Sequence, residues 1–159
     1  MRGFVGVILA AAVLAVGGPV AAGPLGIGVM LGDPTGLSAK VWTTRDTGMD
    51  LGVAWSFIDE AALHVHGDYL IHKPGPPEIE VGGLLFHFGL GGRIKLEEDS
   101  NRVGVRVPVG LTYLLAQSHL EFFLEVAPIL DLAPETDVTA NGGLGIRYYF
   151  GGRPRTRRL

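Results

Sequence analysis

The feature that most constrains the fold is a two-residue alternation of apolar with small or polar side chains. It is clearest over residues 49–57, where every second position is large and apolar: Met49, Leu51, Val53, Trp55 and Phe57. Successive side chains of a β-strand point to opposite faces, so this period predicts a strand with one fully apolar face. Similar segments recur along the chain, and no window with a helical period competes with them.

Turn-forming residues divide the chain after residue 23 into about eight segments. We expect antiparallel strands at 25–31, 37–44, 49–57, 63–72, 80–95, 102–114, 120–132 and 142–150. The Gly32–Gly36 stretch has the Asp, Pro and Gly chemistry of a tight turn. The proline-rich connector at 72–77 is expected to leave the sheet, because proline cannot donate to a strand ladder.

The polarity of the two strand faces decides between a soluble and a membrane barrel. The apolar faces run for about nine to eleven residues, which is the length a tilted strand needs to cross a bilayer. The opposite faces carry glycines and isolated charges, which suit a crowded lumen. The pattern predicts an all-β, antiparallel, up-and-down transmembrane β-barrel of about eight strands. Its expected polar lumen network, with a structural role, contains Lys40, Asp50, His64, His66, Asp68, His87, Arg93, Arg106, Glu125, Asp131 and Arg147.

Charge pairing inside such a barrel is close to obligatory, because an unpaired charge in a dry site costs several kcal/mol. We expect Arg147 to approach Glu125 from the neighbouring strand. Arg106 is expected near Asp131 or, across the lumen, near another acid.

A histidine-rich stretch is the strongest candidate for metal binding. His64, His66 and Asp68 share one strand face, and the connector suggests a register that brings His87 near Asp68. A zinc or copper site is one interpretation. We favour a hydrogen-bonded lumen network, and therefore expect no metal, no cofactor and no catalytic residue.

Aromatic residues recur near the ends of the expected strands. An interfacial girdle of a membrane barrel has aromatics at these positions, although ordinary packing would place them there too. The residues are Trp42, Trp55, Phe57, Tyr69, Tyr113, Tyr148 and Phe150.

The N-terminal stretch is predicted to be a signal peptide covering residues 1–22. Arg2 precedes an apolar run, Gly17 to Pro19 break it, and small residues lead to cleavage after Ala22. The barrel would then span 23–150, and 151–159 would form a basic, disordered C-terminal tail. The chain has no cysteine and a net charge of −3, which excludes disulfides and a lipoprotein anchor and gives nucleic acid no electrostatic footprint.

The last strand carries Gly145, Tyr148 and Phe150, a glycine followed by alternate aromatics. It resembles the terminal-strand assembly signal of outer-membrane barrels. With its strand count and export signal, the chain resembles the small OmpA- or OmpX-type barrels and the uncharacterised outer-membrane barrel-domain proteins. The resemblance implies a bacterial outer-membrane location, recognition by the barrel assembly machinery, and closure of the last strand against the first. Nine further residues follow Phe150, whereas the aromatic usually ends the chain.

The expected outer loops at 33–36, 59–62, 97–101 and 134–141 are short. We therefore predict a monomeric barrel in outer-membrane lipid, with a plugged lumen and a structural or membrane-integrity role with modest surface interaction. The alternatives are a narrow pore, a rim enzyme acting on lipid, and a soluble lipocalin-like ligand-binding barrel. An enzyme is not expected, since no serine lies in a nucleophile motif.

Overall fold

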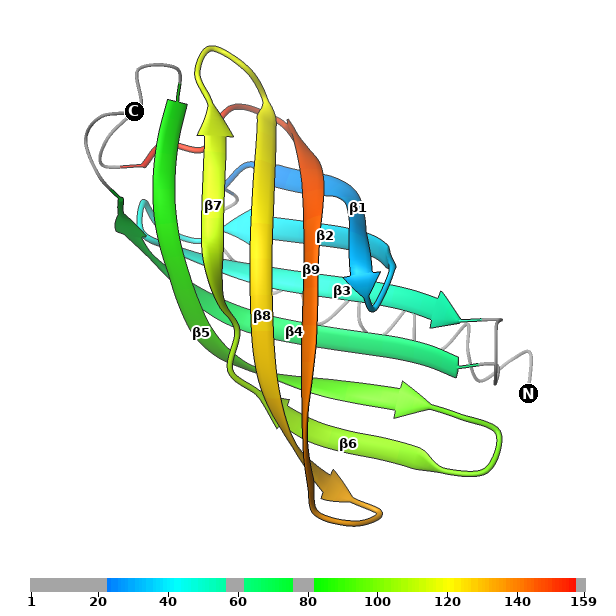
Figure 1. Ribbon diagram of the computed structural model, residues 1–159. Coiled ribbons are helices and arrows are strands. Elements are labelled where there is room, and N and C mark those ends of the chain that lie inside the picture. Colours follow the sequence, from blue (N-terminus) through cyan, green and yellow to red (C-terminus); the bar gives the residue numbers. More distant parts are fainter. Residues whose placement is uncertain (1–22, 57–61, 76–81, 157–159) are drawn as a thin grey trace.

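The computed structural model describes residues 23–56, 62–75 and 82–156 (Figure 1). The predicted signal peptide, residues 59–61 of the expected loop at 59–62, and the last three residues of the chain lie outside the described residues. In the described part every regular element is a strand, and no helix there has the length and apolar character that would let it cross a bilayer.

Nine strands make up the described sheet. They are β1 (Leu25–Asp33), β2 (Gly36–Trp42), β3 (Thr47–Ser56), β4 (Ala62–Pro74), β5 (Gly82–Leu96), β6 (Asn101–Arg106), β7 (Val109–Leu115), β8 (Leu120–Ala133) and β9 (Asp137–Phe150).

The sheet closes into a barrel because the last strand pairs with the first. β9 runs antiparallel to β1, with Phe150 opposite Leu25 and Gly142 opposite Asp33. This register confirms the expectation that the terminal strand closes the barrel. β6 and β7 both pair with β5 on one side and β8 on the other, so together they fill one position in the ring. The nine strands thus make an eight-position barrel.

The single strand expected over 102–114 is interrupted at Val107 and Pro108. Proline has no N–H to offer the ladder, and both residues lie outside the assigned strands. Backbone bonds bridge the break, because Gly89 N donates to Pro108 O and Val107 N donates to Pro128 O. The face alternation therefore continues across it, with Arg106, Pro108 and Thr112 all buried.

Two connections between strands are shorter in the structure than the sequence predicts. β4 extends to Pro74, which lies opposite Leu85, so the first part of the proline-rich connector does join the ladder. Proline is tolerated there because it ends the strand. β9 begins at Asp137 rather than at residue 142, which leaves only residues 134–136 between β8 and β9.

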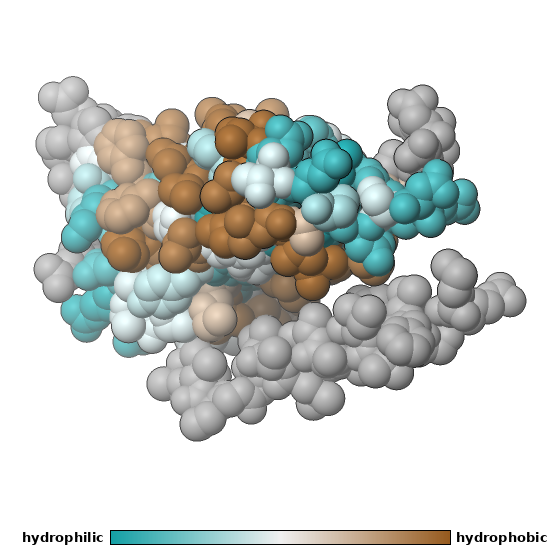
Figure 2. All heavy atoms as spheres, turned by 90° about the horizontal axis from the view of Figure 1, so that it is seen from below, coloured by the Kyte–Doolittle hydropathy of each residue, from teal (hydrophilic) through white to brown (hydrophobic). Residues whose placement is uncertain are grey.

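The barrel is apolar outside and polar inside. Large apolar side chains on the outer wall are roughly half exposed, as at Leu90 (60 %) and Leu144 (55 %). Figure 2 shows them gathered over the wall, with hydrophilic residues toward the ends. The alternative of a soluble lipocalin-like barrel needs the apolar faces to point inward, and the structure overturns it.

Several of the aromatic residues named for the girdle point outward, as a girdle requires, and one does not. Trp55, Tyr69, Tyr148 and Phe150 point outward and are exposed. Trp42 is buried inside the barrel, where it packs with Leu85, Leu114 and Tyr149. Phe57 lies outside the described residues.

Candidate functional site

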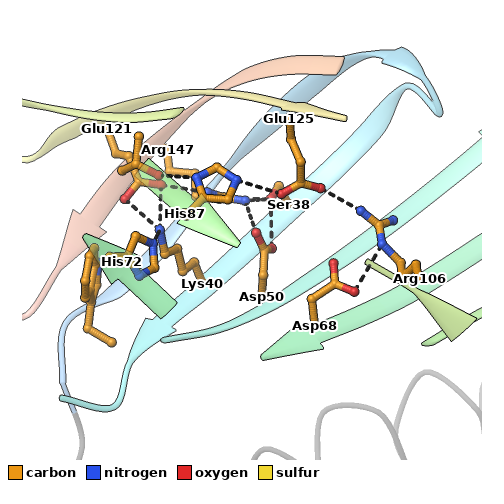
Figure 3. A network of polar contacts seen from close by, with 12 residues as sticks. Ser38, Lys40, Asp50, Asp68, His72, His87, Arg106, Glu121, Glu125 and Arg147 are labelled. Atoms are coloured by element: carbon orange, nitrogen blue, oxygen red, sulfur yellow. Dashed lines mark hydrogen bonds and ion pairs between the residues drawn. The ribbon is translucent and has the colours of Figure 1, made fainter. Parts of the chain in front are cut away.

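Each strand contributes its inward face to a charged lumen. We call the end with Leu25 and Phe150 the terminal end and the opposite end the far end. All of the predicted lumen residues lie on inward faces, and all except Glu125, whose side chain is 12 % exposed, are classed as buried. Except for His64 and His66, their contacts form three groups along the barrel, two of which appear in Figure 3.

Arg147 is the centre of the terminal-end cluster. Its Nη1 donates to Glu121 Oε1 over 2.6 Å, and its Nη2 donates to Asp50 Oδ2 over 2.5 Å. Ser38 Oγ accepts from the Nε and Nη2 of the same guanidinium at 2.9 and 2.7 Å. This one cation therefore connects side chains of β2, β3, β8 and β9 across the lumen.

Glu121 extends the terminal-end cluster toward the barrel mouth. Both of its oxygens lie 3.3 Å from Lys40 Nζ, and Tyr149 Oη donates to Oε2 over 2.6 Å. Trp42 Nε1 donates in turn to Tyr149 Oη. Lys40 Nζ also lies 2.9 Å from His72 Nε2. Lys40 and Glu121 are fully buried, so each charge is stabilised by the other, and Arg147 supplies Glu121 with a second cation.

The middle cluster is built around Arg106. Its Nη2 donates to Glu125 Oε1 over 2.6 Å, and its Nε lies 3.1 Å from Asp68 Oδ1, an ion pair whose angle is poor for a hydrogen bond. Glu125 Oε2 lies 3.1 Å from His87 Nε2, and the other ring nitrogen of His87 lies 2.9 Å from Thr112 Oγ1.

The far-end cluster pairs Arg93 with Asp131. Arg93 Nε and Nη2 both bond to Asp131, at 3.1 and 2.5 Å, in a bidentate geometry. Nη2 also donates to Thr139 Oγ1. The three clusters fill successive levels of the lumen.

Two of the expected partners are wrong, and strand register is the reason. β8 and β9 align Arg147 with Glu121, while Glu125 lies opposite Gly143. Asp131 pairs with Arg93 rather than with Arg106. Arg106 instead contacts two other acids, Glu125 on the neighbouring β8 and Asp68 two strand positions away on β4.

The histidines do not converge. His87 lies opposite His72, and Asp68 lies opposite Gly91, so the expected approach of His87 to Asp68 is wrong. His64 and His66 contact each other edge to face, with ring centroids 5.6 Å apart. Among the described residues, no group of three or more acidic or histidine side chains is arranged to hold a metal ion.

Several members of the lumen were missing from the predicted network, including Ser38, Thr112, Thr139 and three larger side chains. Glu121, His72 and Tyr149 share the inward parity of Glu125, His66 and Arg147 on their own strands. Strict use of the alternation would have found them. Glu121 matters most, because it contacts Lys40, Arg147 and Tyr149.

A small cavity lies between the terminal-end and middle clusters. It has a volume of about 30 Å³ and lies beside His66, Arg106 and Arg147. A cavity of this size has room for about one or two water molecules.

A closed eight-position barrel with an apolar wall and an ionic lumen defines a class, the transmembrane β-barrel. The fold is that of an OmpA- or OmpX-type outer-membrane barrel. Among solved structures, the N-terminal β-barrel domain of Pseudomonas aeruginosa OprF matches 81 % of this chain and 98 % of its own, with a TM-score of 0.59 and 14 % identity. Ail, the attachment invasion locus protein of Yersinia pestis, matches 80 % of this chain and 97 % of its own, with a TM-score of 0.37 and 14 % identity.

The likeness to OprF establishes the fold and carries no activity to this chain. No protein-family model matches the sequence. No curated protein matches it either.

Proposed function

We propose that this chain is exported to a bacterial outer membrane, where it acts as a small, closed barrel with a structural or membrane-integrity role. The carrying observation is the inverted polarity: half-exposed apolar side chains cover the wall, while paired charges fill the lumen. A wall of this kind is stable only against hydrocarbon.

The three clusters support the proposal of a closed lumen. An eight-stranded barrel is just wide enough for side chains to fill its interior. At each level an arginine joins strands that are not neighbours in the sheet: Arg147 reaches Asp50 on β3, Arg106 reaches Asp68 on β4, and Arg93 reaches Asp131 on β8. Opening a water path would separate buried ion pairs, which costs several kcal/mol for each lost partner.

The far-end turns support a modest surface role. The described connections at 34–35, 97–100 and 134–136 are short. Long loops are the usual carriers of recognition in such barrels. We propose a monomer whose main contact is with lipid, which uses the assembly machinery during biogenesis and has no catalytic role.

Planar-bilayer recording tests the closed lumen. The folded wild-type protein should give no stable conductance steps. A variant with Lys40→Ala, Glu121→Ala and Arg147→Ala removes three of the four terminal-end charges, and it serves as the opened comparison once gel mobility shows that it folds. Stable unitary steps from the wild type would contradict the proposal.

Membrane integrity is tested in cells. Deletion of the gene should raise uptake of a hydrophobic dye, and the wild-type gene should restore the barrier. Unchanged dye uptake after deletion would refute the membrane-integrity role, but it would not contradict the assignment of the fold as a barrel. N-terminal sequencing of the membrane form should begin at Gly23, and a retained Met1 would refute export by cleavage.

A further inference from the structure

A basic cleft lies at the terminal end of the barrel. Its volume is about 460 Å³, within the range of small-molecule sites. Three stretches distant in sequence line it: the start of the described chain at 23–24, the end of β2 and its turn at 42–45, and the segment after β9 at 151–155. Figure 1 shows the last of these in red, running across the end of the barrel beyond β9.

The segment after β9 presents two arginines to this cleft. Gly151 and Gly152 have φ angles of 75° and 134°, which side-chain-bearing residues rarely adopt, and they turn the chain out of the strand. Beyond them Pro154 is buried, whereas Arg153 and Arg155 are exposed and line the cleft. The first part of the expected disordered tail thus packs at the barrel end, through residue 156.

The opposite wall adds a third guanidinium. Arg45 is exposed in the β2–β3 turn, beside the hydroxyls of Thr43 and Thr44. Within the described residues, neither Arg45, Arg153 nor Arg155 has an acidic partner at ion-pair distance. The other described arginines are each paired with an acid: Arg93, Arg102, Arg106 and Arg147.

Gly23 brings the chain start into the same cleft. It approaches Trp42 so closely that an added Cβ would lie 1.9 Å from the Trp42 carbonyl oxygen. Cleavage after Ala22, as the sequence predicts, would leave the α-ammonium group of Gly23 at this position. The cleft would then hold four cationic groups, a composition that selects an anion.

The position of the cleft relative to the membrane indicates which kind of anion it binds. Tyr148 and Phe150 point outward and contact each other edge to face, with ring centroids 4.9 Å apart, and aromatic side chains are enriched at membrane interfaces. Arg153 follows Phe150 by three residues, which places the cleft at headgroup level just beyond the apolar wall. We propose that this cleft binds the phosphate group of an anionic phospholipid in the leaflet next to the terminal end.

This inference rests on the proposed membrane placement. The test is native mass spectrometry of the full, processed protein in detergent, with phosphatidylglycerol or phosphatidylcholine added. The wild type should retain phosphatidylglycerol preferentially. Arg153→Gln with Arg155→Gln should weaken this binding about 25-fold, because each arginine near an anionic lipid surface contributes roughly fivefold. Arg45→Gln should weaken it as well.

The matched control is Lys95→Gln with Arg102→Gln, which removes two positive charges at the far end. It should bind phosphatidylglycerol like the wild type. Every variant is first checked for a heat-modifiable gel shift, so loss of the barrel is distinguished from loss of the site. Equal retention of both lipids by a folded wild type would overturn the proposal and leave the membrane barrel standing.

A further experiment distinguishes binding of a lipid from binding of a free anion. Millimolar inorganic phosphate should leave the phosphatidylglycerol complex in place, because the lipid also contacts the apolar wall beside Phe150. Complete displacement by inorganic phosphate would assign the cleft to a free phosphate and overturn the lipid assignment.

Discussion

Arg147 on β9 lies directly opposite Glu121 on β8, and its Nη1 donates a hydrogen bond to Glu121 Oε1 over 2.6 Å. Both side chains are buried, at 2 % and 0 % exposure. The same guanidinium reaches Asp50 across the lumen, so this pair connects neighbouring and opposite walls.

The Arg147–Glu121 pair should show strong energetic coupling. Arg147→Met or Glu121→Gln alone should each lower the free energy of unfolding by about 3–5 kcal/mol, because each leaves a buried partner uncompensated. The double variant should lose less than the sum, with a coupling energy of about 0.5–3 kcal/mol. Urea unfolding in lipid vesicles gives all four values. Arg147 with Glu125, which share no contact, is the control cycle, and equal coupling in both cycles would refute the pairing.

The cost of placing a charge on the outer wall should depend on how deep in the bilayer the substituted position lies. Leu144 lies near the middle of β9 and Val138 near its far end, and both point outward. Leu144→Arg should cost about 2–4 kcal/mol in a bilayer, whereas Val138→Arg should cost about 0–1 kcal/mol. The measurement is unfolding from phospholipid vesicles. Near-zero cost at both positions would indicate a wall that faces water.

Because β1 and β9 are in close contact at Gly28, adding a side chain at this position should destabilise the barrel. A Cβ added there would lie 1.8 Å from the Ile146 carbonyl oxygen, which belongs to the backbone and cannot move aside. Gly28→Ala should destabilise the barrel by about 1–3 kcal/mol. Gly67→Ala is the matched control, because its Cβ would first meet Asp50 O at 3.7 Å. Unfolding of the two variants at the same urea concentration would show that β1 and β9 do not approach this closely at Gly28.

A pH-dependent contribution is expected at the far end. Lys95 donates to Glu97 at 2.5 Å and holds the pKa of that carboxyl below its usual value, with help from Arg102. A lowered pKa in the folded state stabilises the fold above the ordinary pKa of 4.5, and this gain is lost as pH falls through the folded value.

Glu97→Gln should therefore cost at most about 1 kcal/mol at neutral pH, since the partners are partly exposed and screened. The difference from wild type should vanish in acid and shrink in high salt. Unfolding curves across pH provide the measurement, and a difference that persists in acid would argue against this ion pair.

The sequence was sufficient to predict which face of each strand points inward. Alternation is local, so the inward parity of Lys40, Asp50 and Arg106 can be read from their own segments. The sequence did not predict that the strand is interrupted at Pro108, or that β9 already pairs with β8 before residue 142. Both features depend on bonds to β5 and β8, which no single segment reveals.

Partner choice in the lumen was beyond local reasoning. A shift of four residues along β8 exchanges Glu125 for Glu121 opposite Arg147, and the turn that sets this register has no unique length in the sequence. Contacts across the lumen, such as Arg147 with Asp50, depend on the curvature of the closed barrel. Trp42 was misplaced because an aromatic near a strand end suits either a girdle or a lumen plug.

The most direct test of the central claim is the gel mobility of the membrane-extracted protein, boiled and unboiled, combined with separation of inner and outer membranes. A closed membrane barrel predicts enrichment in the outer membrane and a clear mobility shift on boiling. A protein that is soluble without detergent and shows no shift would contradict the outward apolar wall, and with it the account of the charged lumen.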